Sequence, residues 1–375
     1  MSCSPALRLD VASVRNRLLG LCGAILMLAL VTGCGSGGGG SSSTAPVAHG
    51  LWVPNYKGNT VTEFTGSKLE TSGTPSADLT NSSSHLNGPV GSTFDKNNNL
   101  WLSNYNNGTL VEYTLSQLKK LAGTPAPAAK VVISGLLCPA GVVFDGSGNL
   151  WVADFCKSDL VEFTPTQLAA SGSPTPHITI TSTSFVSPVF VGFDKSGNLW
   201  LADSLSTADS TGSAGEVFEF TPSQLSTGGL QTPNVSLATP TLNYPYAVAF
   251  DASGNMWVAN NSNSNPGTLQ EFAASDLSGS GVIQPAAMVT ISATAVTTTT
   301  GIAQSLDGPT GLAFDSSGNL WVANGDSDNH GSLAEFTPGQ LATSGSPSPN
   351  VFLDSDASGT NLNFPAHLIF GPSIK

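Results

Sequence analysis

The chain has 375 residues, only 10% of which are charged, and its formal net charge is −13 at neutral pH. So acidic and lysine-poor a composition excludes a nucleic-acid-binding protein, because phosphates require a basic surface. Hydrophobic residues make up 39% of the chain. They recur in short runs between clusters of Gly, Ser, Asn and Pro, which excludes intrinsic disorder and predicts many short strands joined by turns.

The first 33 residues have the pattern of an export signal. Three arginines, Arg8, Arg15 and Arg17, precede an apolar stretch at residues 18–31. This stretch is shorter than a membrane-spanning helix requires. Removal of residues 1–33 would leave 9 basic and 24 acidic residues, a net charge of −15.

A cysteine closes this segment, which ends in Val-Thr-Gly-Cys at residues 31–34. Small residues before a cysteine at this position resemble the bacterial lipobox. The resemblance implies that Cys34 is diacylated and anchors the protein to the envelope, with Gly35 favouring the outer membrane. The alternative is a plain transmembrane anchor with an incidental cysteine. Residues 34–48 are rich in Gly and Ser and predict a flexible tether.

A repeat begins at residue 49, marked by tryptophans spaced 49, 50, 49, 57 and 64 residues apart. This period is close to the length of a four-stranded propeller blade. Six marked repeats predict six blades over residues 49–375. The tryptophans are Trp52, Trp101, Trp151, Trp200, Trp257 and Trp321.

Each repeat predicts four strands, A to D. Strand A runs from a proline to Phe-Asp, as at residues 139–145, and an Asp-x-Ser-Gly-Asn turn leads into strand B around the tryptophan. Strand C carries Leu-x-Glu-Phe, as at 160–163, and strand D is a short apolar run, as at 350–353. A Thr-Pro-x-Gln-Leu segment between strands C and D predicts a short helix, because Thr caps and Pro begins helices. It occurs at residues 164–168, 221–225 and 337–341.

The two ends of the repeat region are complementary. The first repeat starts at strand B, residues 50–55, whereas residues 364–371 align with the strand A segment at 244–251. The last strand is therefore expected to complete the first blade and close the ring, which leaves no exposed sheet edge at a seam. The predicted fold is an all-β, six-bladed propeller of four-stranded blades.

The motif Phe-Asp-x-x-Gly-Asn-Leu-Trp-Val-Ala-Asp resembles NHL-repeat propellers. It is more loosely similar to the six-bladed gluconolactonase-like and virginiamycin B lyase-like families. The resemblance covers about residues 50–371. It describes the blade and not the chemistry, because one fold hosts many functions.

The two faces of such a propeller differ in their loops. The D-to-A links and B-to-C loops share one face, here called the loop face, and the irregular insertions all fall on it. A varied face on a regular scaffold predicts a binding surface, and the alternative is tolerated drift in surface loops. The insertions are residues 204–214, 261–267, 292–308 and 325–331.

Cys138 and Cys156 are expected to lie close together in the fold. A hairpin folded about residues 146–148 brings both cysteines to equivalent positions on strands A and B. An exported compartment would allow them to form a disulfide. A free thiol pair and a metal site are the alternatives.

Every strand B ends in Asn or Asp on the loop face. Gluconolactonase-like enzymes hold a divalent metal over the channel with such residues, so the resemblance implies a possible cation at Asn104, Asp154 and Asp203. The alternative is that these residues cap the B-to-C turn, because the same residue type recurs in every blade. A structural cap of this kind requires no cofactor. The six residues are Asn55, Asn104, Asp154, Asp203, Asn260 and Asn324.

The third residue of each strand A is expected to point into the channel, and among these only His367 has an imidazole. Virginiamycin B lyase-like enzymes use a channel histidine with a carboxylate, so the resemblance implies a general base at His367. The sequence does not identify the carboxylate that would pair with His367. A histidine with a purely structural role is the alternative.

Aromatic residues follow the Asn/Asp position in three successive repeats, at Tyr56, Tyr105 and Phe155, and Phe190 and Tyr246 start two strands A. Such rings suit a neutral sugar or a peptide, and packing between blades is the alternative. Because no catalytic set is assembled, the sequence favours a binding module for a glycan, peptide or envelope protein. A lactonase-like or lyase-like enzyme is the second hypothesis.

Overall fold

The computed structural model describes residues 49–119, 128–205, 215–262, 266–298, 301–325, 331–355 and 362–374. The predicted export signal, Cys34 and the whole predicted tether at 34–48 lie outside these ranges. Among the described residues, no helix is long and apolar enough to span a lipid bilayer.

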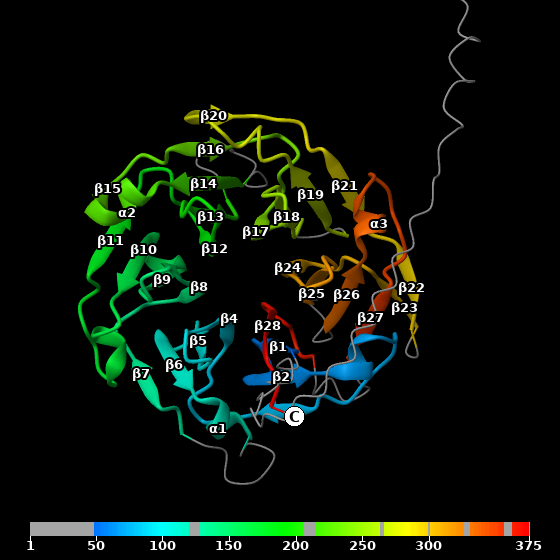
Figure 1. Cartoon of the computed structure of the whole chain (residues 1–375), viewed down its shortest axis with the longest axis horizontal. Helices are drawn as coiled ribbons and strands as arrows, with labels where there is room; N and C mark the ends of the chain where they lie inside the picture. The colour runs from blue at the N-terminus through cyan, green and yellow to red at the C-terminus, as the bar shows by residue number, and fades with distance from the viewer. Residues whose placement is uncertain are drawn as a thin grey trace, which may run out of the picture. The chain divides into compact units, whose positions relative to one another are not determined.

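Six antiparallel sheets are arranged around a central axis, which confirms the predicted propeller (Figure 1). Each blade runs from an inner strand A to an outer strand D. Blade 1 consists of β28 (Ile369–Pro372), β1 (His49–Asn55), β2 (Thr60–Phe64) and β3 (Leu79–Asn81). Blade 2 consists of β4 (Pro89–Phe94), β5 (Leu100–Asn104), β6 (Thr109–Tyr113) and β7 (Val131–Ile133). Blade 3 consists of β8 (Pro139–Phe144), β9 (Leu150–Asp154), β10 (Asp159–Phe163) and β11 (Ile178–Thr181).

The other three blades repeat this order. Blade 4 consists of β12 (Pro188–Phe193), β13 (Leu199–Asp203), β14 (Glu216–Phe220) and β16 (Val235–Leu237). Blade 5 consists of β17 (Pro245–Phe250), β18 (Met256–Asn260), β19 (Thr268–Phe272) and β21 (Val289–Ser292). Blade 6 consists of β24 (Pro309–Phe314), β25 (Leu320–Gly325), β26 (Gly331–Phe336) and β27 (Val351–Asp354).

The C-terminal strand closes the ring, as predicted. β28 pairs with β1 in antiparallel register, with Leu51 opposite Phe370. The strand is shorter than expected, because Pro365 makes only an isolated bridge to Asn55 before β28 begins. Residues 366–368 lie between this bridge and β28, and of these Ala366 donates its amide to the Pro54 carbonyl at 3.0 Å.

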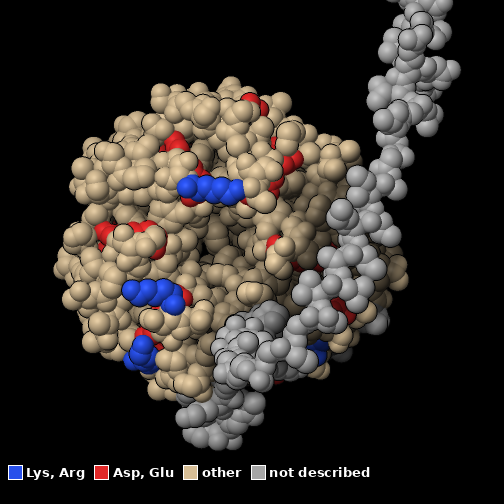
Figure 2. Space-filling view, in the orientation of Figure 1, with Lys and Arg blue, Asp and Glu red and all other residues tan. Residues whose placement is uncertain are grey.

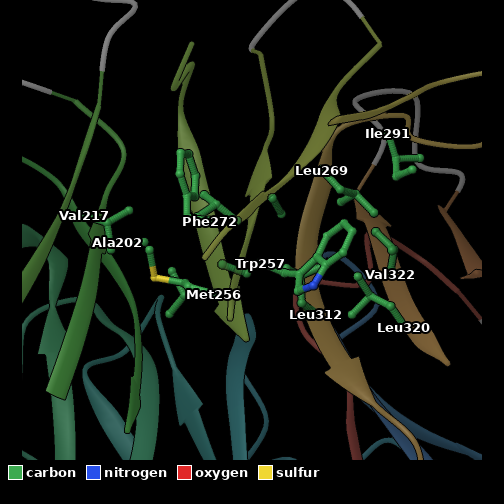
Figure 3. Close-up of a cluster of buried hydrophobic side chains, with 14 of the residues drawn as sticks. Ala202, Val217, Met256, Trp257, Leu269, Phe272, Ile291, Leu312, Leu320 and Val322 are labelled. Atoms are coloured by element: carbon green, nitrogen blue, oxygen red, sulfur yellow. The ribbon is translucent and has the colours of Figure 1, made fainter. Parts of the chain in front are cut away.

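The core lies between the blades. In four blades the strand B tryptophan packs on the phenylalanine that ends strand A of the next blade, with ring centroids 6.1–6.3 Å apart. One of these pairs is Trp321 with Phe370, so closure through β28 continues the contact around the ring. Figure 3 shows the buried indole of Trp257 facing Leu312 and Leu320 of the following blade.

The Asp-x-Ser-Gly-Asn turns are held by their own side chains. In blade 3, Asp145 Oδ1 accepts the amides of Ser147 and Asn149 at 2.8 and 2.9 Å. Its Oδ2 accepts the Asn149 side-chain amide at 2.8 Å and the Trp151 indole N–H at 3.3 Å. In blades 3 and 4 one carboxylate therefore holds both the turn and the core tryptophan.

The outer edge of a blade is covered by the C-to-D link of the next blade. A Ser-Gly pair makes this contact in parallel orientation: Gly172 pairs with Ile133 of blade 2, and Ser171 Oγ accepts the Val132 amide at 3.0 Å. Gly73 and Gly345 make equivalent bridges. Two of these links form short strands. β15 (Gly229–Leu230) pairs with β11, and β20 (Gly281–Ile283) pairs with β16. The ring thus shields edges that would otherwise pair with other chains.

Short helices and one extra hairpin complete the structure. The predicted Thr-Pro-x-Gln-Leu helices are present, and Thr221 with Gln224 forms a reciprocal capping box. The first of the three forms only a 3-10 turn. The helical elements are α1 (Leu115–Lys119), α2 (Pro222–Thr227), α3 (Pro338–Leu341), η1 (Gly66–Leu69), η3 (Phe155–Lys157) and η4 (Gln167–Ala169), and the hairpin is β22 (Ala295–Thr297) with β23 (Ile302–Gln304).

Candidate functional site

A cavity of about 240 Å³ lies at the mouth of the central channel on the loop face. Each blade contributes to it the residue that follows the proline at the start of strand A. These six residues are Val90, Ala140, Val189, Tyr246, Thr310 and Ala366. The remaining lining residues are aromatic and come from B-to-C loops, from strand A of blade 4 and from the last D-to-A link. They are Tyr56, Tyr105, Phe155, Phe190 and Phe364.

The cavity is lined mainly from the second residue of strand A, not from the third as expected. The A-to-B register slips by one residue after the proline in five blades, as between Pro309 and Gly311. This bulge turns the second side chain toward the axis. Where the third position is glycine it faces the neighbouring blade: a Cβ on Gly141 would lie 2.6 Å from Phe190 Cα. Phe190 is the one third-position residue among the described residues that line the cavity.

Four of the rings form a continuous arc over blades 1 to 3. Tyr56 lies between Phe364 and Tyr105, with ring centroids 5.6 and 6.1 Å away. Phe155 continues the arc 5.8 Å from Tyr105. The rings meet at angles of 56–80°, which are the edge-on geometries that aromatic pairs prefer. The arc therefore presents a preformed aromatic wall.

Tyr246 in blade 5 faces this arc across the channel. Burial, and then the phenols of Tyr105 and Tyr56, raise the pKa of Tyr246 above its ordinary value. Burial is also the largest cause that raises the pKa of Tyr105. The phenols of Tyr105 and Tyr246 are consequently neutral at physiological pH, and they act as hydrogen-bonding groups without charge.

Phe190 lines the cavity and packs against His367, which is buried and is not among the lining residues. Their ring centroids are 4.6 Å apart, and His367 Nδ1 is 2.8 Å from Ser92 Oγ. Burial lowers the pKa of His367 to about 3, so its imidazole is neutral. The general-base role considered for His367 requires a pKa near the working pH. In this environment the imidazole is a weak base.

The six Asn and Asp residues at the ends of strands B are buried and none of them lines the cavity. They hold the D-to-A links instead. Asp154 accepts the amides of Leu137 and Cys138, both at 2.8 Å. Asn104 accepts the Asn87 amide at 3.0 Å and donates to the His85 carbonyl at 2.8 Å. This arrangement matches a structural cap.

The other four members of this set have similar partners. Asp203 accepts the amides of Val186 and Ser187 at 2.9 and 2.7 Å, and burial raises its pKa to about 7. Asn260 accepts the amide of Asn243 at 3.1 Å, and Asn324 donates to the Ser305 carbonyl at 3.1 Å. Asn55 instead donates to Thr60 and Thr62, both at 3.2 Å. In the described part of the chain, no three His, Cys, Asp or Glu side chains are grouped to hold a metal ion.

The predicted disulfide between Cys138 and Cys156 is confirmed, with 5.2 Å between the Cα atoms. It joins the D-to-A link of blade 3 to the B-to-C loop, directly beside Phe155. The amide of Phe155 also donates to the Cys138 carbonyl at 3.1 Å. The crosslink therefore fixes the loop that carries one wall of the cavity.

Phe364 is the aromatic residue that the sequence reasoning did not select. It precedes Pro365 and aligns with Tyr244, and both residues have a positive φ, 56° and 51°. The alignment of Phe364 with Tyr244 in the sequence could therefore have identified Phe364 as a candidate. The predicted variable loops at 204–214 and 325–331 fall largely outside the described residues, and residues 263–265 of the loop at 261–267 do so too. The loop at 292–308 contains the β22–β23 hairpin.

Grooves between blades also occur elsewhere. The larger, of about 610 Å³, lies between blades 3 and 4 and is lined by the turns at Asp145 and Asp194. Its Glu162 is 2.9 Å from His177, so these groups pair with each other. Figure 2 shows one face of the molecule, on which Lys and Arg side chains are few and Asp and Glu side chains lie around the ring.

No protein-family model matches the chain, and no curated protein matches it by sequence. Solved structures do match. A Bacteroides caccae protein of unknown function has a TM-score of 0.56 at 11% identity, covering 87% of this chain and 100% of its own. This match supports the propeller fold alone.

Two further matches have lower TM-scores. A streptogramin B lyase has a TM-score of 0.47 at 10% identity, covering 82% of this chain and 78% of its own. A catalytically inactive virginiamycin B lyase from Staphylococcus aureus, with quinupristin, has a TM-score of 0.46 at 11% identity, covering 79% and 84%. The resemblance to NHL repeats stays a prediction.

Proposed function

We propose that the protein is a lipid-anchored, extracytoplasmic binding module whose propeller takes its ligand at the aromatic cavity of the loop face. The observation that carries this proposal is the convergence of six aromatic rings on one cavity at the channel mouth. Aromatic side chains with a few hydrogen-bonding groups are typical of binding sites. Glycans, peptides and envelope proteins are the ligand classes considered.

The proposed location rests on the N-terminal segment and on the disulfide. Residues 1–33 have the pattern of an export signal that ends at a lipobox-like Cys34. A disulfide between Cys138 and Cys156 suits an oxidising compartment outside the cytoplasm. Both features favour an exported protein attached to the bacterial envelope, with the outer membrane as the proposed site.

The alternative of an enzyme at the channel has less support. His367 is neutral and hydrogen-bonded to Ser92, and Phe190 covers its ring. The carboxylates of Asp154 and Asp203 accept hydrogen bonds from backbone amides of the D-to-A links. A binding module requires none of these groups to be reactive.

The test of the binding role compares the wild-type protein with Tyr105→Ala on glycan and peptide arrays. Leu230→Ala is the matched control, because Leu230 is a 72% exposed side chain on the outer rim. We expect the wild type and the control to bind the same ligands and Tyr105→Ala to lose them. Equal binding by all three proteins would contradict the proposed site.

The test of the anchor is metabolic labelling with a fatty acid in a bacterial host. We expect label in the wild-type protein and none in Cys34→Ala, which should be released from membranes. Label in both proteins, or in neither, would contradict acylation at Cys34.

A further inference from the structure

We infer that the group bound in the aromatic cavity is an uncharged aromatic side chain of a peptide segment, and not a sugar ring. The inference rests on the proposed function and specifies its ligand. It follows from the size of the cavity, from its hydrogen-bonding groups and from the charges at its rim.

The size of the cavity restricts what can enter. Its volume is about 240 Å³, below the range of about 300–1,000 Å³ in which drug-sized ligands are usually held. Phe190, whose ring centroid lies 4.6 Å from that of His367 at an interplanar angle of 43°, is among the residues that line it. The cavity therefore accepts one ring-sized group, while the rest of the ligand stays on the surface of the loop face.

The hydrogen-bonding groups are too few for a sugar. Two of the four hydroxyls on the lining are already engaged: Tyr56 donates to Asn106 Oδ1 at 3.0 Å, and Thr310 donates to the Pro365 carbonyl at 2.7 Å. Among the described lining residues, the phenols of Tyr246 and of Tyr105 remain, and the latter lies 4.0 Å from the disulfide sulfur of Cys156. A sugar ring carries several hydroxyls and would leave most of them without partners when buried, which is unfavourable.

The charges at the rim disfavour an ionic group. The described lining residues carry no charge at neutral pH, so they cannot neutralise a buried ion. Aromatic rings do attract cations. One face of Phe364, however, is already covered by Lys57, whose Nζ lies 5.2 Å from the ring centroid. A second cation beside Lys57 would be repelled.

An exposed apolar residue beside the cavity favours a peptide ligand. Leu137 is 53% exposed, and its amide is held by Asp154 next to the disulfide and Phe155. A peptide that inserts one aromatic side chain would place its neighbouring residues over this part of the loop face. Leu137 offers them an apolar contact outside the cavity.

The experiment is saturation-transfer NMR on the purified protein with three probes: N-acetyl-phenylalaninamide, N-acetyl-lysinamide and methyl α-glucoside. We expect transfer to the phenylalanine amide alone, with a dissociation constant on the order of 1 mM for so small a ligand. Tyr105→Ala should weaken binding about tenfold through loss of one aromatic contact. Leu230→Ala should bind like the wild type, and thermal unfolding will verify that both variants fold.

The outcomes separate the two proposals. Transfer to the glucoside or the lysine amide in place of the phenylalanine amide, lost in Tyr105→Ala, would overturn the inference and support the proposed function. Transfer that Tyr105→Ala leaves unchanged, or none from any probe, would overturn both.

Discussion

Phe190 and His367 stack across the central channel, with their ring centroids 4.6 Å apart. Phe190 belongs to β12 of blade 4, and His367 lies just before β28 of blade 1, the opposite blade of a six-bladed ring. Because Phe364 and Ala366 of the closing segment line the cavity, its lining is complete only when the ring is closed. The cavity and the closure are thus parts of one arrangement.

The stacked histidine should make stability depend on pH. The pKa of His367 is lowered from 6.5 to about 3 in the folded protein, so between these values the unfolded chain binds one more proton. Its contribution is complete above pH 6.5 and is lost as the pH falls toward 3. We expect the wild type to lose about 1.4 kcal/mol per pH unit relative to His367→Gln across this window.

Urea unfolding of both proteins at several pH values measures this difference. Carboxylates with raised pKa values, such as Asp203 and Asp159, are common to both proteins and cancel. A difference between the two proteins that does not change with pH would contradict a neutral buried imidazole.

Asp154 should be replaceable by Asn but not by Ala. Asp154 accepts two link amides, whereas Asn104 holds the equivalent link of blade 2 with one accepted amide. We expect Asp154→Asn to lose about 1 kcal/mol of unfolding free energy and Asp154→Ala about 2–3 kcal/mol, since both amides then lack an acceptor. Denaturant unfolding measures both values, and a loss of stability on adding a chelator would instead indicate a bound cation.

The disulfide should stabilise the protein without being needed for its fold. The equivalent junctions of the other blades have no cysteine pair, and the crosslinked residues are 18 apart in sequence. We expect Cys138→Ser with Cys156→Ser to fold with a loss of up to about 3 kcal/mol. Reductant should lower the unfolding midpoint of the wild type only. An equal effect on the variant would show that the disulfide is not the cause.

Gly141 should not tolerate a side chain. A Cβ there would lie 2.6 Å from Phe190 Cα and 2.8 Å from the Val189 carbonyl oxygen. We expect Gly141→Ala to cost about 1–3 kcal/mol, because strands A of blades 3 and 4 must move apart. Gly146→Ala is the matched control, since nothing lies within 4 Å of its Cβ; it should stay within about 0.5 kcal/mol of the wild type.

The sequence predicted the blade count, the closure and the disulfide because each leaves a periodic or paired signal. The tryptophan spacing marks the blades, and residues 364–371 match a strand A pattern that the first repeat lacks. Tyr56, Tyr105 and Phe155 were found in the same way, since they share one place in successive repeats and the structure brings them to one cavity. Whether they bind a ligand stays a prediction.

Other features could not be predicted, because they depend on local backbone geometry. The bulge after the strand A proline exchanges the roles of the second and third residues, and no residue type marks it. This is why Thr310 was missed as a lining residue. His367, which was expected to point into the channel, is buried and does not line the cavity. The stack of Phe190 on His367 joins opposite blades, a contact that sequence periodicity does not describe.

The Ser-Gly contacts at the outer rim allow the repeats to vary. The link of blade 3 meets blade 2 through main-chain groups of Gly172 and the hydroxyl of Ser171, and blade 6 meets blade 5 through Gly345 in the same way. Such a rim contact does not depend on the other side chains of the two strands that it joins. The core between blades still constrains the interior residues, but side chains on the outer rim could diverge during evolution while these edges remained covered.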